Sequence, residues 1–148
     1  MEEARQDRLL EIEDLRTHFL LDEGVLQAVD GVSLTIDRHE TVGIIGESGC
    51  GKSVMAQSVL RIVPPPGKLV GGRILLHTDE AAPVDIAALD PFGEEIRQIR
   101  GGVISMVFQE PMTSLSPVHT IGDQVAEMIL QHTKASKQEA ADRTLELL

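Results

Sequence analysis

Apolar and polar positions alternate in two stretches near the beginning of the chain. Residues 9 to 15 alternate at Leu10 and Ile12 and, after a slip of one position, at Leu15, and residues 25 to 37 repeat the pattern. Alternation with a period of two is typical of a strand with one buried face. The sequence therefore predicts two neighbouring strands before residue 40.

Turn signals divide this region. Asp22-Glu23-Gly24 predicts a turn between the two stretches, and Asp30-Gly31 predicts a bend or a hairpin turn inside the second one. Because sequential strands joined by a short turn pair antiparallel, we expect an antiparallel β layer.

The middle of the chain changes pattern several times. The apolar run at 42–45 predicts a strand, and residues 54–63, which lack glycine and proline, predict a helix that the sequence Pro-Pro-Pro-Gly at 64–67 must end. After Gly71-Gly72, residues 73–77 predict a short strand. A strand, a loop and a helix in this order are typical of α/β proteins.

The last third of the chain is predicted to be mostly helical. Asp90-Pro91 is typical of a helix start, with an N-cap followed by proline, and predicts a helix through Ile99. The apolar run at 103–108 predicts a buried strand. Residues 120–131 have apolar positions at helical spacing, and Ser136-Lys137-Gln138-Glu139 is a capping box that opens one more helix.

A glycine-rich loop connects the strand at 42–45 to the following helix. It reads Gly46-Glu47-Ser48-Gly49-Cys50-Gly51-Lys52-Ser53, which satisfies the pattern G-x-x-x-x-G-K-[ST]. In such a P-loop the backbone N–H groups surround the phosphates of a nucleotide, and the glycines permit the close approach. Lys52 would contact the β- and γ-phosphates, the Ser53 hydroxyl would bind Mg²⁺, and the helix dipole would add positive potential up to Val54.

Composition limits the other functions of the chain. Its 148 residues are enough for one domain, and a net charge of -11 with 2% aromatic residues and no basic run argues against a nucleic-acid surface. The single cysteine, Cys50, excludes an intrachain disulfide and suits a reducing cytosol. We find no signal peptide, no apolar run of about 18 residues and no histidine pair at metal-ligand spacing.

The order of these features resembles the ATP-binding subunits of ABC transporters. More narrowly, residues 46–54 and the run Val-Phe-Gln-Glu-Pro-Met-Thr-Ser-Leu-Ser-Pro at 107–117 resemble the oligopeptide and dipeptide importer branch. The resemblance spans residues 9–148. It implies an α/β fold, a P-loop NTPase (ABC ATPase) core with an N-terminal antiparallel β subdomain, truncated within the helical subdomain.

The resemblance also implies a division of this single domain. Residues 9–40 would form the β subdomain, 41–109 the P-loop core, and 110–148 the Q-loop and the start of the helical subdomain. The implied cofactors are ATP and Mg²⁺. The implied partners are the membrane-spanning subunits and a second ATP-binding subunit, identical or different, at the cytoplasmic face of the inner membrane, with peripheral attachment.

Individual roles follow from the family only where the motifs match. Gln109 would be the Q-loop glutamine, a catalytic residue that contacts Mg²⁺ or the attacking water, and Phe19 would stack on adenine. Residues 110–117 would face the coupling helix of the membrane subunit. His39 stands where the family usually has a glycine with positive φ, so we expect modest backbone strain there.

The parts of the family that complete hydrolysis are expected beyond Leu148: a Leu-Ser-Gly-Gly-Gln signature, a strand ending in Asp-Glu, and a switch histidine. Residues 69–73 imitate the signature but lack its serine and precede Gln109, and residues 86–90 imitate the Asp-Glu strand but are followed by Pro91. We interpret the chain as the N-terminal part of an importer ATPase that is incomplete for hydrolysis.

Other classes explain less of the sequence. A Ras-type GTPase needs an Asn-Lys-x-Asp motif, and the chain contains no asparagine. A small-molecule P-loop kinase leaves the β layer and the Gln109 segment unexplained. The alternative that stays open is a nucleotide-binding remnant or regulatory module that does not hydrolyse ATP.

Overall fold

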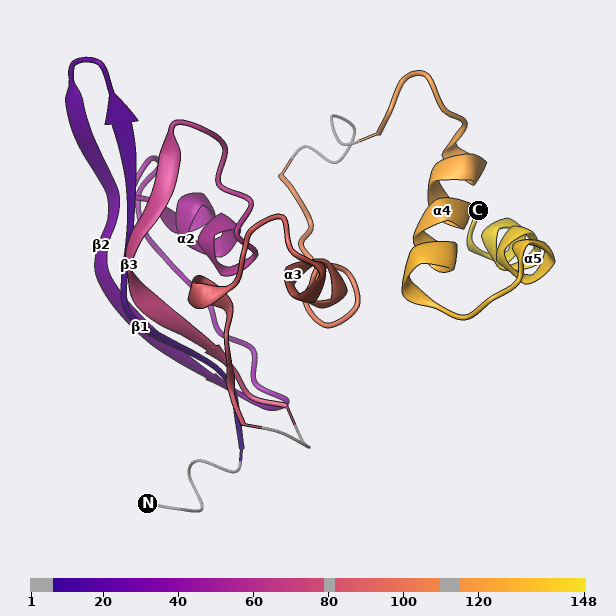
Figure 1. Ribbon diagram of the computed structural model, residues 1–148, viewed down its shortest axis with the longest axis horizontal. Coiled ribbons are helices and arrows are strands. Elements are labelled where there is room, and N and C mark those ends of the chain that lie inside the picture. Colours follow the sequence, from indigo (N-terminus) through magenta and orange to yellow (C-terminus); the bar gives the residue numbers. More distant parts are fainter. Residues whose placement is uncertain (1–6, 79–81, 110–114) are drawn as a thin grey trace. The chain divides into compact units, whose positions relative to one another are not determined.

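The computed structural model describes residues 7–78, 82–109 and 115–148 (Figure 1). Contacts between residues divide the chain into two compact units, Met1–Ile96 and Arg97–Leu148, and each unit is described by itself. The first holds a sheet and the helix that follows the P-loop, and the second is largely helical.

A four-stranded antiparallel sheet organises the first unit, with strand order β2-β1-β3-β4. Its strands are β1 (Arg8–Leu21), β2 (Gly24–Asp37), β3 (Gly67–Leu76) and β4 (Val84–Asp85). β1 and β2 form a hairpin around the turn at 22–23, as the alternating pattern predicts. Both strands extend beyond the predicted stretches because paired backbone groups continue to the turn.

Four register shifts interrupt the pairing of β1 with β2, and two of them bear on the sequence predictions. Ile12 pairs with Leu34 and Leu15 pairs with Val32, so β1 carries one extra residue, which is the slip seen in the sequence. A second one falls at Gly31, whose φ of 77° lies in the left-handed region. The prediction of a bend or hairpin turn at Asp30-Gly31 is therefore corrected: β2 continues through it, and glycine allows the irregularity.

The helix α2 (Lys52–Val59) covers one face of this sheet (Figure 1). A hydrogen bond of 2.8 Å joins the hydroxyls of Thr17 on β1 and Ser58 on α2, both of them buried. The first unit also buries a set of apolar side chains, namely Leu10, Ile12, Leu15, Val29, Met55, Val59, Leu60, Ile74, Leu75, Leu76, Ile86 and Ile96. The helix is thus held by apolar burial and by one satisfied polar contact.

Three further element boundaries differ from those predicted. α2 ends at Val59 and not at residue 63, because Arg61 adopts a left-handed φ of 55° that ends the helix before the prolines. β3 begins at Gly67 and not at Arg73, since Gly72, with a φ of 91°, lies at a register shift inside the strand.

The third boundary concerns helix α3 (Glu94–Ile99), which begins four residues after Asp90. The Asp90 carboxylate accepts the N–H of Phe92 at 3.0 Å, so it closes a turn and does not cap the helix. Residues 86–90 form no strand, as expected: Ile86–Ala88 is a short 3₁₀ helix capped by Asp85.

Two predicted strands are absent. Residues 42–45 and 103–108 are assigned no strand, and within the part of the chain described, the second run makes only an isolated bridge between Arg100 and Ile104. Ile45 is 98% exposed and Val107 is 90% exposed. An apolar run forms a buried strand only when neighbouring strands pair with it, and the described residues supply none there. Both predictions are wrong for this structure.

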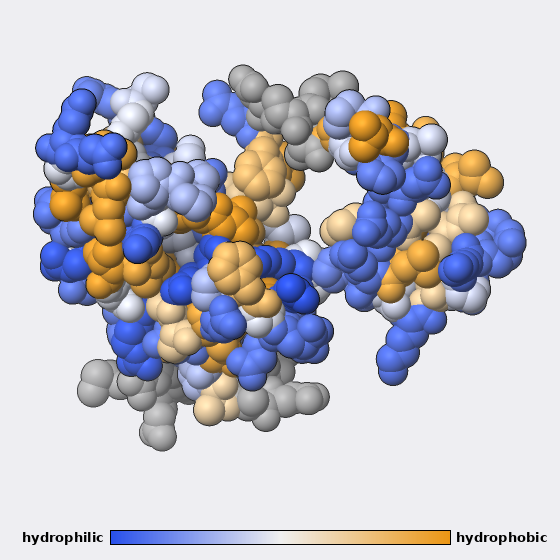
Figure 2. Space-filling view, turned by 45° about the horizontal axis from the view of Figure 1, so that its top comes forward, coloured by the Kyte–Doolittle hydropathy of each residue, from blue (hydrophilic) through white to orange (hydrophobic). Residues whose placement is uncertain are grey.

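The second unit contains the helical pair α4 (Ile121–His132) and α5 (Lys137–Leu147). Thr120 caps α4, and the predicted capping box of α5 is confirmed. Apolar side chains, orange in Figure 2, reach the surface in both units, and Met128 and Leu145 are among them in this one. None of the helices described is long and apolar enough to cross a membrane.

The capping box predicts how α5 responds to acid. The Glu139 carboxylate accepts the backbone N–H of Ser136 at 2.7 Å, and this bond, followed by the Ser136 hydroxyl, lowers the pKa of Glu139 from its ordinary 4.5. A lowered pKa in the folded state stabilises α5 above pH 4.5, and this stabilisation is lost as the pH falls through the folded value. We expect Glu139→Gln to reduce this acid-dependent change.

Amide hydrogen exchange of α5 between neutral pH and pH 3, corrected for intrinsic rates, measures the effect. Glu146→Gln, on the same helix but outside the capping box, is the control and should retain the acid response. Equal acid responses in both variants would contradict the assignment.

Candidate functional site

The Lys52 side chain folds back across the P-loop. Its ammonium donates to the carbonyl oxygens of Gly46 at 2.8 Å and Glu47 at 2.6 Å, and it lies 3.4 Å from the Cys50 sulfur. The loop therefore encloses its own cation in a compact arrangement. An ammonium has three donors, so it can donate to several oxygen acceptors at once.

Two glycines shape the loop. Gly49 and Gly51 have φ values of 83° and 92°, in the left-handed region that side chains rarely adopt. A Cβ atom on Gly51 would also collide with the carbonyl oxygen of Ala28 on β2. The end of the loop is thus packed tightly on the sheet, and only glycine fits there.

The beginning of α2 is suited to an anion. Gly51 is its N-cap and supplies no side-chain acceptor, and the first turn contains no acidic residue. The first N–H groups of such a helix point outward with the positive end of the dipole, where a phosphate is favoured. Ser53 is exposed in this first turn. The residues present therefore fit a bound phosphate chain and its Mg²⁺.

Phe19 lies half-buried near the end of β1. It pairs with Leu26 on β2 and with Gly67 on β3, and a Cβ atom on Gly67 would stand 2.8 Å from its ring. Phe19 is two residues from Thr17, so the two side chains share the sheet face that α2 covers.

Gln109 is exposed and belongs to the second unit, whereas residues 46–54 and Phe19 belong to the first. The segment 110–117, expected to face a membrane subunit, falls partly outside the described residues, which resume at Leu115. His39 has a φ of 61°, so the positive φ expected at this position is confirmed.

Sequence reasoning missed one contributor to the site. Ala28 acts through its backbone carbonyl, which fixes the space available at Gly51. A backbone contact between segments more than twenty residues apart leaves no residue-type signal. Only the strand assignment of Ala28 could have suggested that it lies near the loop.

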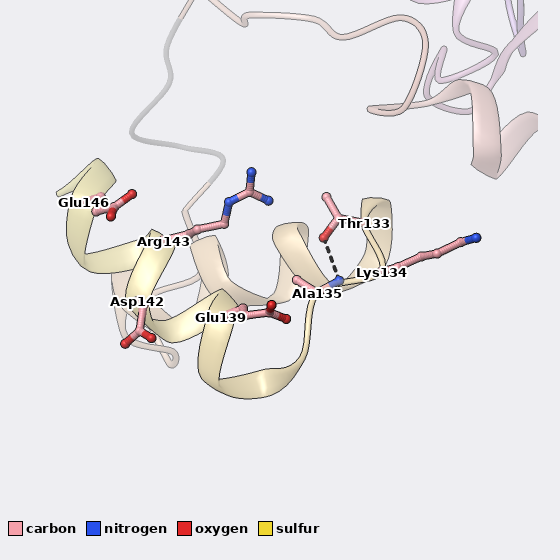
Figure 3. A pocket seen from close by; sticks show the side chains of 7 residues that line it. All are labelled: Thr133, Lys134, Ala135, Glu139, Asp142, Arg143 and Glu146. Atoms are coloured by element: carbon pink, nitrogen blue, oxygen red, sulfur yellow. Dashed lines mark hydrogen bonds between the residues drawn. The ribbon is translucent and has the colours of Figure 1, made fainter.

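A separate hollow of about 430 Å³ lies in the second unit (Figure 3). Its lining comes from the α4–α5 connection and from α5: Thr133, Lys134, Ala135, Glu139, Asp142, Arg143 and Glu146. Two cationic and three anionic side chains share this surface, so its charge favours no one class of ligand. The P-loop is the better candidate site.

The ABC transporter family model matches residues 29–148. The chain therefore belongs to the ABC transporter family, whose ATPases bind ATP, generally with Mg²⁺, and work with membrane subunits. The importer resemblance seen in the sequence is confirmed by the relatives below.

Similar curated proteins are ATP-binding proteins of peptide transport. A probable peptide ABC transporter ATP-binding protein of Sinorhizobium fredii is 43% identical over 97% of this chain and 41% of its own length. The oligopeptide transport ATP-binding protein OppD of Bacillus subtilis is 41% identical over 97% of this chain and 38% of its own length. The chain thus spans about two fifths of these relatives.

Solved structures support the fold class. One of them is the dimeric ATP-binding cassette MJ0796 bound to ADP and Pi, which matches with a TM-score of 0.74 and 26% sequence identity. The match covers 93% of this chain and 55% of the MJ0796 chain. The chain therefore has the ABC ATPase fold in part, with the antiparallel sheet that the sequence predicts.

The contact of Gly51 with β2 yields a stability prediction. Gly51→Ala should lower the free energy of unfolding by at least about 2 kcal/mol, because left-handed backbone alone costs about 1–2 kcal/mol and the Ala28 carbonyl must also move. Gly43→Ala is the matched control, since its Cβ would meet open space and its φ is not positive. Urea denaturation measures both, and equal losses would refute the close packing.

Proposed function

We propose that this chain is the ATP-binding part of an ABC importer for peptides or similar small solutes. The observation that carries the proposal is the loop from Gly46 to Ser53, in which Lys52 is held by two carbonyl oxygens and Gly51 is packed on β2. This arrangement presents a cation and helix N–H groups at one point, which is what a nucleotide phosphate requires.

The residues have distinct roles in the proposal. Lys52 binds the β- and γ-phosphates, and Ser53 provides a hydroxyl for Mg²⁺. The backbone N–H groups from Gly46 to Val54, including those of Glu47, Ser48 and Cys50, surround the phosphates. Phe19 supports the adenine base. Mg²⁺ would neutralise part of the phosphate charge, which matters because the chain carries a net charge of -11.

The remaining parts of the proposal concern the assembled transporter. Gln109 would act in catalysis and contact Mg²⁺, and the segment 110–117 would meet a membrane-spanning subunit. We further propose a dimer with a second ATP-binding subunit and a peripheral position at the cytoplasmic face of the membrane. The domain division at residues 40 and 109 belongs to the same proposal.

Hydrolysis is assigned to the longer protein in this proposal, because orienting water and holding Mg²⁺ needs more groups than the P-loop offers. A second candidate is a nucleotide-binding module that does not hydrolyse ATP. This second candidate is considered because the chain spans only about two fifths of the length of the relatives it matches. Nucleotide affinity without turnover would support it for the chain alone.

Binding of fluorescent ATP with Mg²⁺ tests the central proposal. Lys52→Ala should abolish saturable binding, because the cation that would hold the phosphates is removed. Lys68→Ala, which removes an exposed lysine of β3, is the control and should bind normally. ATP binding that survives Lys52→Ala would refute the proposed site. Steady ATP turnover by the unmodified chain that is lost in Lys52→Ala would refute the proposal that the chain is incomplete for hydrolysis.

The role of Phe19 is tested by separating base from phosphate. Phe19→Leu should weaken ATP binding about tenfold, as expected when aromatic stacking worth about 1–3 kcal/mol is lost, and should leave inorganic triphosphate binding unchanged. Phe92→Leu is the control, since Phe92 is 81% exposed and lies in the turn before α3. An equal loss for both ligands would assign Phe19 to packing alone.

A further inference from the structure

One side chain holds the segment that precedes α4. Gln124, half-buried in the second turn of that helix, accepts the backbone N–H of Ser116 through its Oε1 at 2.8 Å. Its Nε2 donates to the carbonyl oxygen of Ser116 at 3.1 Å and to that of His119 at 3.1 Å. A single amide thus binds both backbone groups of Ser116.

Neighbouring contacts make the same turn compact. The Ser116 hydroxyl and His119 Nδ1 lie 2.9 Å apart, and Thr120 accepts the N–H of Asp123 at 3.1 Å to cap the helix. Residues 116–120 therefore form a closed turn on the amino end of α4. We call this turn, fixed by Gln124, the α4 anchor.

The chemistry of the anchor requires an amide. Ser116 presents a donor and an acceptor at once, so the group that binds it needs an acceptor and a donor side by side. Glutamate offers acceptors alone, lysine offers donors alone, and methionine of similar length offers neither. Glutamine in this position is hence a specific choice and not merely a polar helix residue.

We propose that Gln124 is a positioning residue that fixes the carboxyl end of the segment 110–117 to α4. The inference rests on the proposed function, in which that segment contacts a membrane-spanning subunit. A contact segment that is fixed at one end loses less conformational entropy when it binds a partner. A displacement of that segment by the partner is also passed to the helix to which the segment is attached. Gln124 thereby links the segment after Gln109 to the helical unit.

Hydrogen exchange of the Ser116 amide, followed by NMR in the full 148-residue chain, tests the anchor directly. Gln124→Met should speed this exchange at least about fivefold, because a hydrogen bond of ordinary net strength is lost. Gln131→Met is the matched control: the same substitution on the same helix, where the Gln131 amide donates to Glu127 at 3.4 Å. Unchanged Ser116 exchange in Gln124→Met would overturn the proposal.

Gln124→Glu keeps the test valid if α4 unfolds in the methionine variant. Its carboxylate retains an acceptor for the Ser116 N–H but no donor for the two carbonyl oxygens, so protection of Ser116 should fall between those of the unmodified chain and Gln124→Met. With α4 still helical, exchange in Gln124→Glu as fast as that in Gln124→Met would contradict protection of the Ser116 N–H by the side-chain acceptor and would overturn the proposal.

A second measurement distinguishes positioning from mere stability. Membrane-spanning subunits of a peptide importer from the same source, reconstituted in nanodiscs, should bind Gln124→Met more weakly than Gln131→Met, with Mg·ATP affinity the same in both. Equal binding of both variants would overturn the positioning role. A further outcome is that the unmodified chain fails to bind the membrane-spanning subunits although its Ser116 amide is protected. That result would refute the proposed function and, with it, the positioning role of Gln124, but it would leave the hydrogen bonds of the α4 anchor confirmed.

Discussion

The close approach of Gly51 to the Ala28 carbonyl is the constraint on which the site depends. It places the end of the P-loop against β2, and the buried hydroxyl pair of Thr17 and Ser58 fixes α2 two turns further along. Both ends of the first two turns are thus in contact with the sheet, which opposes rotation of the helix about its axis. The hairpin therefore helps to set the direction in which the first N–H groups of α2 point.

The state of Lys52 bears on how the loop receives a nucleotide. Its ammonium is already bound by the carbonyls of Gly46 and Glu47, so the loop is ordered around the cation before phosphate arrives. Phosphate oxygens would replace neutral acceptors with charged ones, and charge-assisted hydrogen bonds are roughly twice as strong. In the proposed function, this preformed arrangement would reduce the ordering cost of nucleotide binding. Because the chain carries a net charge of -11, the local field of the loop would have to attract the nucleotide.

Local signals in the sequence predict the features that local physics determines. The hairpin, the slip before Leu15, the capping box at Ser136 and the positive φ of His39 depend on residues within a few positions, and all four are present. The strands predicted at 42–45 and 103–108 depend on partners elsewhere in the sequence, and an apolar run alone does not supply them. The residues of the P-loop can be predicted from its motif. The contribution of Ala28 cannot be predicted from residue type, because its backbone carbonyl makes the contact.

The division into two units separates two kinds of chemistry. The residues proposed to hold phosphate, Lys52 and Ser53, lie on the unit built around the sheet, whereas Gln109 and the α4 anchor lie on the helical unit. In the proposed function, Gln109 would have to contribute to the nucleotide site from the helical unit, so that site would draw on residues of both units. Gln109 lies only seven residues before Ser116, where the α4 anchor begins, so a displacement of the segment between them would reach the glutamine at one end and α4 at the other.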